Sequence, residues 1–206
     1  MSKVQVDTID TRSGTSTMQI GSTNTSTINI GVSGDTVNIP SGVTIANAGT
    51  ATGFGEANTP AFSVQLGFNQ SQSISDSTLT KVELDSEYFD TDSAFDTSNY
   101  KFTVPSGKAG KYFFTWGVYL YQDTNSNLVN TEAVLYLNGN RYIGANFSFQ
   151  NNYAKFHTHG SSAFLDLSVA DYIELYGSVN SDNGGGSTQF YGGDRATFLT
   201  GYRVTT

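Results

Sequence analysis

The sequence contains no cysteine, and it has only three prolines, two histidines and ten basic residues among 206. Without cysteine, neither disulfides nor thiolate metal sites can stabilise the chain, so stability has to come from packing or assembly. The ten lysines and arginines are scattered singly, and the formal net charge is −8. Binding to nucleic acid through phosphates needs clustered positive charge, so we expect no nucleic-acid partner.

Long hydrophobic runs are also absent. No stretch approaches the ~18 apolar residues of a membrane-spanning helix, and the first residues contain no apolar core of a secretory signal. We therefore expect a protein that is synthesised in the cytoplasm and does not insert into a membrane. If it acts outside a cell, we expect it to leave by a route other than general secretion.

Helical patterns are scarce, because no segment keeps apolar residues at helical spacing for more than about one turn. Charged residues make up 14% of the chain, well below the ~25% of an average soluble protein. Glycine, serine, threonine and asparagine take their place. This composition predicts an all-β fold with many turns.

Aromatic residues are missing from residues 1–53, whereas all 27 of them lie between Phe54 and Tyr202. The first segment consists mostly of serine, threonine, asparagine and glycine, with aliphatic side chains in pairs two residues apart. A glycine or proline directly follows several of these pairs. The pairs are Met18 and Ile20, Ile28 and Ile30, Val37 and Ile39, and Val43 and Ile45.

Each aliphatic pair indicates a very short strand with both side chains on one face. Two side chains per strand cannot form a core in a single chain, but three chains wound about one axis would bury them together. The alternative is a disordered linker, which the composition also permits. The regular spacing favours an intertwined trimeric β stalk with these eight aliphatic residues as its core.

The chain therefore divides into three expected parts. Residues 1–53 form an attachment segment and stalk, residues 54–60 a glycine-rich neck, and residues 61–206 a head domain. Within the head, short apolar alternations separated by turn signals predict a β-sandwich or barrel. The expected strands are Ala61–Leu66, Thr80–Leu84, Tyr100–Val104, Gly110–Gln122, Glu132–Leu137, Asn140–Gln150, Tyr153–Leu167, Tyr172–Ser178, Ser187–Tyr191 and Arg195–Val204.

Several motifs follow one another along the head. They are Ala61-Phe62-Ser63-Val64, Lys101-Phe102-Thr103-Val104-Pro105, Gly110-Lys111-Tyr112-Phe113-Phe114, the hairpin signal Asn138-Gly139, Leu165-x-Leu167-x-x-Ala170-Asp171-x-Ile173, and Phe198-Leu199-Thr200-Gly201-Tyr202. In this order they resemble the complement-type globular head, a tumour-necrosis-factor-like jelly roll, over residues Ala61 to Val204. Ala170 stands where that family has glycine, and the segments before Gly110 and Tyr202 are slightly longer than in the family.

This resemblance implies a jelly-roll β-sandwich head that acts as a binding module and forms homotrimers with aromatic contacts about a threefold axis. The same oligomeric state is what the aliphatic pairs of the first segment require. We therefore expect an all-β homotrimer, with an N-terminal intertwined β stalk followed by the jelly-roll head.

The opening Val6-Asp7-Thr8-Ile9, followed by serine-, threonine- and glycine-rich repeats, resembles the start of bacteriophage tail-fibre and related appendage proteins. This resemblance implies a virion appendage, joined to other tail or capsid proteins through its N-terminus. Its trimeric head would bind a glycan or protein on the host cell surface. Two alternatives stay open: a virion decoration or assembly protein without a receptor role, and a spike that cleaves surface polysaccharide.

Loops on a rigid β-scaffold are the usual place for recognition. The polar loops of the head supply the candidate receptor-binding residues, which are Tyr121, Asp123, Asn125, Asn127, Asn151, Asn152, Asn180, Asp182 and Asn183. Tyrosines near strand ends are further candidates, because an aromatic ring can stack on the apolar face of a ligand. They are Tyr119, Tyr121, Tyr142, Tyr153, Tyr176 and Tyr191, and each could instead belong to the core or to a trimer contact.

Two features could bind a metal ion. His157 and His159 face the same side of an alternating strand, but no carboxylate near them in sequence completes a site, so a polar face or subunit contact is preferred. A dense acidic stretch could hold calcium, although it lacks the spacing of the helical calcium loop. It comprises Glu83, Asp85, Glu87, Asp90, Asp92 and Asp96. We expect a solvated acidic loop, and no cofactor or metal.

No catalytic motif is recognisable. The sequence contains no Gly-x-Ser-x-Gly elbow, phosphate-binding loop or dinucleotide fingerprint. Paired carboxylates for glycoside cleavage are defined by spacing in the fold, so the sequence leaves that possibility open. We expect no catalytic residues and no enzymatic activity.

Overall fold

The computed structural model describes residues 20, 26–31, 33–44, 46, 58–122, 128–149, 154–182 and 187–204. The chain divides into two compact units, Met1–Ala51 and Thr52–Thr206. Across these described ranges, no helix combines the length and the apolar character needed to cross a membrane.

The described residues of the first unit form turns and irregular segments, and none of them lies in a strand. Their aliphatic side chains are exposed in the single chain. They are Ile20, Ile28, Ile30, Val37, Ile39 and Val43, whereas Met18 and Ile45 lie outside the described residues. Strands of an intertwined stalk pair between chains, so the trimeric stalk stays a prediction.

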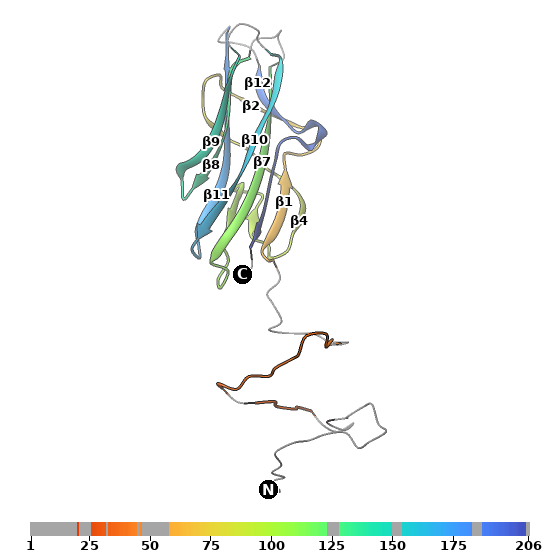
Figure 1. Ribbon diagram of the computed structural model, residues 1–206. Coiled ribbons are helices and arrows are strands. Elements are labelled where there is room, and N and C mark those ends of the chain that lie inside the picture. The colour runs from red at the N-terminus through yellow and green to blue at the C-terminus, as the bar shows by residue number, and fades with distance from the viewer. Residues whose placement is uncertain are drawn as a thin grey trace. The chain divides into compact units, whose positions relative to one another are not determined.

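The second unit is the head, in which two antiparallel sheets pack face to face (Figure 1). The first sheet contains β1 (Ala61–Gln65), β2 (Ser71–Ile74), β4 (Ser86–Asp90), β7 (Gly110–Gln122), β10 (Phe156–Leu167), β12 (Thr188–Tyr191) and β13 (Phe198–Arg203). The second sheet contains β3 (Thr80–Lys81), β5 (Phe95–Asp96), β6 (Lys101–Thr103), β8 (Leu128–Leu137), β9 (Asn140–Ser148) and β11 (Tyr172–Ser181).

The chain crosses repeatedly between the two sheets. From β6 in the second sheet it passes to β7 in the first, returns for the β8–β9 hairpin, crosses to β10, and crosses back to β11 before ending on β12 and β13. Strand neighbours are therefore β6–β11–β8–β9 in one sheet and β10–β7–β13–β1 in the other. This connectivity is that of a jelly roll, and it confirms the expected all-β jelly-roll sandwich.

Strand β7 runs through the middle of the first sheet. It pairs with β10 on one side and with β12 and β13 on the other. Its inward residues Tyr112, Phe114 and Trp116 are fully or almost fully buried, whereas Phe113 and Tyr119 alternate with them on the outer face. Apolar residues on both faces are typical of a central strand, and the pairing places β7 in that position.

Stacked aromatic rings form one end of the core between the sheets. Phe102 from β6 lies 4.8 Å from Phe62 of β1 and 5.8 Å from Phe114 of β7, measured between ring centroids. Tyr112 packs beside them, and its hydroxyl donates a hydrogen bond of 2.6 Å to the carbonyl of Lys108. Burial raises the pKa of Tyr112 to about 12, so the phenol stays neutral. Phe62, Phe102 and Tyr112 come from three different sequence motifs of the head, and their side chains meet in one aromatic cluster of the core.

Two turns take left-handed backbone conformations. Asn138 and Gly139 have φ values of 51° and 74°, as a tight hairpin requires, and confirm the predicted turn between β8 and β9. Ala170 has a φ of 70°, in the left-handed region that favours glycine. Around it, the Ala170 amide donates to the Val104 carbonyl, and the Ser168 amide donates to Asp171 Oδ2.

Several strand expectations were wrong in extent. Strands β2, β4 and β5 were not expected, since their sequences show little apolar alternation. The strand expected at Thr80–Leu84 is reduced to Thr80–Lys81, although Val82 and Leu84 remain buried. Strand β8 begins at Leu128, inside the segment that was expected to be a loop. Arg195 belongs to the short 3-10 helix η1 (Gly193–Arg195) that precedes β13, so the last strand begins only at Phe198.

Candidate functional site

A hollow of about 390 Å³ opens on the outer face of the first sheet. Its lining is three tyrosines with an amide and a hydroxyl beside them: Tyr119, Tyr121, Tyr191, Gln189 and Ser71. We call this site the tyrosine hollow. It lies toward the end of the head at which β7 ends with Gln122 and its neighbours β10 and β12 begin with Phe156 and Thr188.

Strand register brings these five residues together. Tyr119 and Tyr121 are two apart on β7, so both point to the outer face while Leu120 between them is buried. Gln189 of β12 is paired with Tyr121, and Tyr191 of the same strand is paired with Ser71 of β2. The site therefore combines three strands that are far apart in sequence.

The rings form a continuous aromatic surface. Tyr119 and Tyr191 meet edge to face with centroids 5.5 Å apart, and Tyr121 lies 6.4 Å from Tyr191. Phe156 of β10 extends the surface, since its ring meets Tyr119 edge to face at 5.7 Å. Lys155 places its Nζ 5.5 Å from the centre of the Tyr121 ring, so one cation stands at the rim.

The buried hydroxyl of Thr197 connects the backbones of Tyr119 and Tyr191 by hydrogen bonds. Thr197, which is fully buried, accepts a hydrogen bond of 2.9 Å from the Tyr119 amide. Its hydroxyl donates one of 2.7 Å to the Tyr191 carbonyl. The Tyr191 hydroxyl in turn donates to Asn69 Oδ1 at 3.5 Å. These contacts hold two of the three rings on a fixed scaffold.

Burial, followed by the nearby negative charge of Asp194, raises the pKa of the Tyr119 phenol. The phenol therefore stays protonated and can donate a hydrogen bond at neutral pH. With the half-buried rings, the Gln189 amide and the Ser71 hydroxyl, the hollow offers flat apolar surface next to uncharged donors and acceptors. This combination suits a ligand with apolar faces and many hydroxyl groups.

Only part of the expected receptor-binding set can be placed. Tyr121 lines the tyrosine hollow. Asn180 was expected in a loop but lies exposed on β11, where it pairs with Asn130, so that expectation is corrected. Asp182 is exposed directly after this strand. The others, Asp123, Asn125, Asn127, Asn151, Asn152 and Asn183, lie outside the described residues.

Of the six candidate tyrosines, three form the hollow. Tyr176 lies on the second sheet instead, with its ring 4.1 Å from that of Tyr136. Tyr142 is exposed on β9, and Tyr153 lies outside the described residues. Sequence reasoning missed Ser71, Gln189 and Phe156, because nothing in their local sequence marks them and only strand pairing brings them to the tyrosines.

The two histidines of β10 face the second sheet. Their rings lie 5.4 Å apart, which confirms that both point to the same side. His157 Nδ1 is 2.9 Å from the Thr131 hydroxyl, and its ring packs against Phe147 and Phe149. Burial lowers the pKa of both imidazoles, an effect that the charge of Glu132 partly offsets at His159.

The acidic stretch does not form the single solvated loop that was expected, because Glu87 and Asp90 lie on β4, Asp96 lies on β5, and the other three residues lie between strands. Asp85 accepts the Gly67 amide, and Asp90 accepts the amides of Asp92 and Phe95. Asp96 accepts a hydrogen bond from the Asn99 side-chain amide and further ones from the backbone amides of Ser98 and Asn99, and these hydrogen bonds lower its pKa. Among the residues that the structure describes, no group of three or more histidines or carboxylates is close enough together to hold a metal ion.

Comparison with known proteins identifies neither a family nor a curated relative. No family model matches the chain. No curated protein matches it. Matching solved structures include the globular domain of a zebrafish complement 1qA protein, at 16% identity and a TM-score of 0.47, covering 70% of this chain and 97% of that chain. The crystal structure of murine APRIL at pH 5.0 matches at 14% identity with a TM-score of 0.49, covering 70% of this chain and 99% of that chain. The structure of murine APRIL at pH 8.0 matches at 15% identity with a TM-score of 0.47, covering 70% of this chain and 97% of that chain. The fold assignment therefore rests on the strand order itself.

Proposed function

We propose that the protein is a homotrimeric virion appendage of the tail-fibre type, whose head binds a glycan on the host cell surface through the tyrosine hollow. The observation that carries this proposal is the gathering of Tyr119, Tyr121 and Tyr191 around uncharged polar groups on a rigid sheet. The attachment of residues 1–53 to other virion proteins is part of the same proposal, supported by the sequence resemblance of the opening residues.

The outer face of the first sheet supports trimer formation. Toward the Gly110 end of β7, away from the tyrosine hollow, four neighbouring outward residues are uncharged: Phe113 and Thr115 on β7, and Ser162 and Phe164 on β10. There Phe113 lies 4.9 Å from Phe164 and 5.7 Å from Tyr202, measured between ring centroids. Phe164 is 68% exposed in the single chain. A second copy that covers these rings would remove an exposed aromatic cluster from water.

Ala61, the first residue of β1, is paired with Tyr202, so the cluster lies beside the first strand of the head. In the proposed trimer, the clusters of Phe113, Phe164 and Tyr202 from the three chains would face one another. The exposed aliphatic residues of the first unit would be covered in the same assembly.

Shallow hollows of this kind bind single sugar residues weakly, so the proposed mechanism is avidity. Three heads on one stalk, and several stalks on one virion, raise the effective affinity without a deep pocket in any head. The isolated head should consequently bind cells far more weakly than the virion does.

The test is to apply the full chain to arrayed bacterial surface polysaccharides and to compare it with a Tyr121→Ala variant. Tyr121 contributes an accessible ring to the hollow, so we expect the variant to lose most of the signal, about tenfold in apparent affinity. Tyr142→Ala is the matched control, since Tyr142 is exposed on β9 of the other sheet.

Equal losses for both variants would contradict a specific role of the tyrosine hollow. Binding to capsids or tail tubes through the head, with no binding to cells or glycans, would instead favour the decoration protein. Release of reducing ends from the bound polysaccharide would favour the spike that cleaves it.

A further inference from the structure

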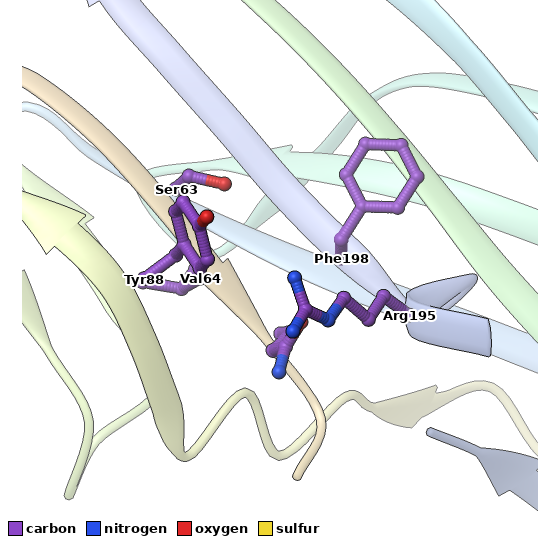
Figure 2. Close-up of a pocket in the computed structure, with 6 residues that line it drawn as sticks. Ser63, Val64, Tyr88, Arg195 and Phe198 are labelled. Carbon is purple, nitrogen blue, oxygen red and sulfur yellow. The ribbon is translucent and has the colours of Figure 1, made fainter. Parts of the chain in front are cut away.

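A second hollow is lined by residues of β1, β4, η1 and β13 in the first sheet and its last connection. Its volume is about 330 Å³, within the ~300–1,000 Å³ range of ligand pockets. The lining residues are Ser63, Val64, Gln65, Tyr88, Arg195 and Phe198 (Figure 2). We call this site the arginine hollow.

Arg195 supplies the charge of the arginine hollow. Its Cζ lies 5.4 Å from the centre of the Tyr88 ring, a cation–π arrangement that holds the guanidinium over an aromatic face. It is the only charged residue among the described lining residues, in a chain whose formal charge is −8. No ion pair between described residues includes Arg195. The hollow therefore presents a positive charge to a ligand that enters it.

The turn that carries Arg195 has an uncommon backbone. Asp194 and Arg195 are consecutive non-glycine residues with φ values of 53° and 56°, in the left-handed region that favours glycine. The preceding Gly193 fits closely, because a Cβ there would lie 2.1 Å from Cε1 of Tyr191. With the turn fixed against Tyr191, the Arg195 side chain extends toward Tyr88 (Figure 2).

The other lining groups are apolar rings and uncharged polar groups. Tyr88 and Ser63 lie on one side of the hollow, and Phe198 lies on the other with Arg195 (Figure 2). The Ser63 hydroxyl shares one hydrogen bond of 2.9 Å with Thr200 and keeps capacity for another. Gln65 adds an amide. Tyr88 is 69% exposed, so its ring is open to a ligand.

We propose that the arginine hollow binds an acidic sugar residue, with the sugar carboxylate on the guanidinium of Arg195 and the sugar ring against Tyr88. The planar guanidinium matches a carboxylate with two parallel hydrogen bonds. The Ser63 hydroxyl and the Gln65 amide match the hydroxyl groups of a saccharide, which favours a sugar over the carboxylate of a peptide. The site is separate from the tyrosine hollow and does not depend on the function proposed for it.

The test is a titration of the full chain with glucuronate, followed by NMR signals of the free sugar, with glucose, inorganic sulfate and N-acetylglutamate as comparisons. We expect glucuronate to bind at least about tenfold more tightly than glucose, because a charge-assisted hydrogen-bond pair is lost with the neutral sugar. Arg195→Gln should weaken glucuronate binding by about tenfold or more, and Tyr88→Ala by a smaller factor.

Arg141→Gln is the matched control, because it removes the same charge from the second sheet, where Arg141 is paired with Glu132. It should leave glucuronate binding unchanged. If Arg195→Gln does not fold, Tyr88→Ala decides the question, since the exposed ring of Tyr88 is not part of the core.

Four outcomes would overturn the proposal. Glucuronate could bind no better than glucose, or equally well to the wild type and both hollow variants. Sulfate could bind as tightly as glucuronate, which would define a simple anion site. N-acetylglutamate could bind as tightly, which would make a peptide carboxylate the better ligand.

Discussion

Phe102 joins the two sheets in the aromatic part of the core. Its ring, from β6 of the second sheet, is fully buried and meets the rings of Phe62, Tyr112 and Phe114 of the first sheet. Truncation would leave a cavity that these rigid rings cannot fill. We expect Phe102→Ala to lower the free energy of unfolding by about 3–5 kcal/mol, measured by denaturant titration.

Phe68→Ala is the control for this change, because Phe68 is 59% exposed. Its effect should stay within about 0.5 kcal/mol. A similar loss of stability in both variants would mean that the aromatic cluster is not the centre of the core.

At the residue scale, composition and motifs predicted core positions better than site positions. Phe62, Phe102 and Tyr112 belong to recognisable motifs, and all three are buried. Tyr119 and Tyr191 could be proposed as binding residues from their type alone, but their mutual contact depends on the pairing of β7 and β12. The backbone of Arg195 was not predictable, since a left-handed arginine has no local signal and its sequence continues a plausible strand.

At the element scale, β9 and β10 lie at edges of the two sheets, and among the described residues each pairs with a single strand, β8 and β7 respectively. His157 and His159 of β10 face β8 and β9 there, next to Thr131, Glu132, Phe147 and Phe149. Burial keeps the pKa of both imidazoles below the ordinary value of 6.5. The folded state therefore binds fewer protons than the unfolded state once the pH falls below 6.5.

We consequently expect the free energy of unfolding to fall as the pH is lowered from 7.5 to 5.5, a range that lies above the ordinary carboxyl titrations. The stability is recovered as the pH rises through 6.5. The double variant His157→Gln, His159→Gln should show a flatter dependence in the same denaturant titrations. An equal slope in the wild type and the double variant would contradict this assignment.

The elements that sequence reasoning missed share one property. Ser71–Ile74 of β2 is a strand of mostly polar residues that pairs with β12 only, so it has no apolar alternation to reveal it. Asn180 was placed in a loop for the same reason, because its polar neighbours conceal the continuation of β11. Long central strands such as β7 were predictable, since burial on one or both faces leaves a pattern in the residues.

At the scale of the whole molecule, we expect other copies of the chain to cover the exposed aromatic cluster of the head and the exposed aliphatic residues of the first unit. We expect light scattering of the full chain to give a mass near three times 22.1 kDa. The head has its own core, so a chain that begins at Phe54 can be measured by itself. It should also form trimers if the cluster of Phe113, Phe164 and Tyr202 is the contact.

The contact can be tested within the head by Phe164→Lys, which places a charge on a ring that is 68% exposed and therefore open to a second copy. We expect the variant head to fall to the mass of one chain, because burying an unpaired ammonium group in an apolar interface is strongly unfavourable. Phe68→Lys introduces the same charge at another exposed phenylalanine and should leave the mass unchanged. A trimeric Phe164→Lys head would place the contact elsewhere on the molecule. A monomeric full-length wild type would return residues 1–53 to the linker interpretation and remove the basis for an avidity mechanism.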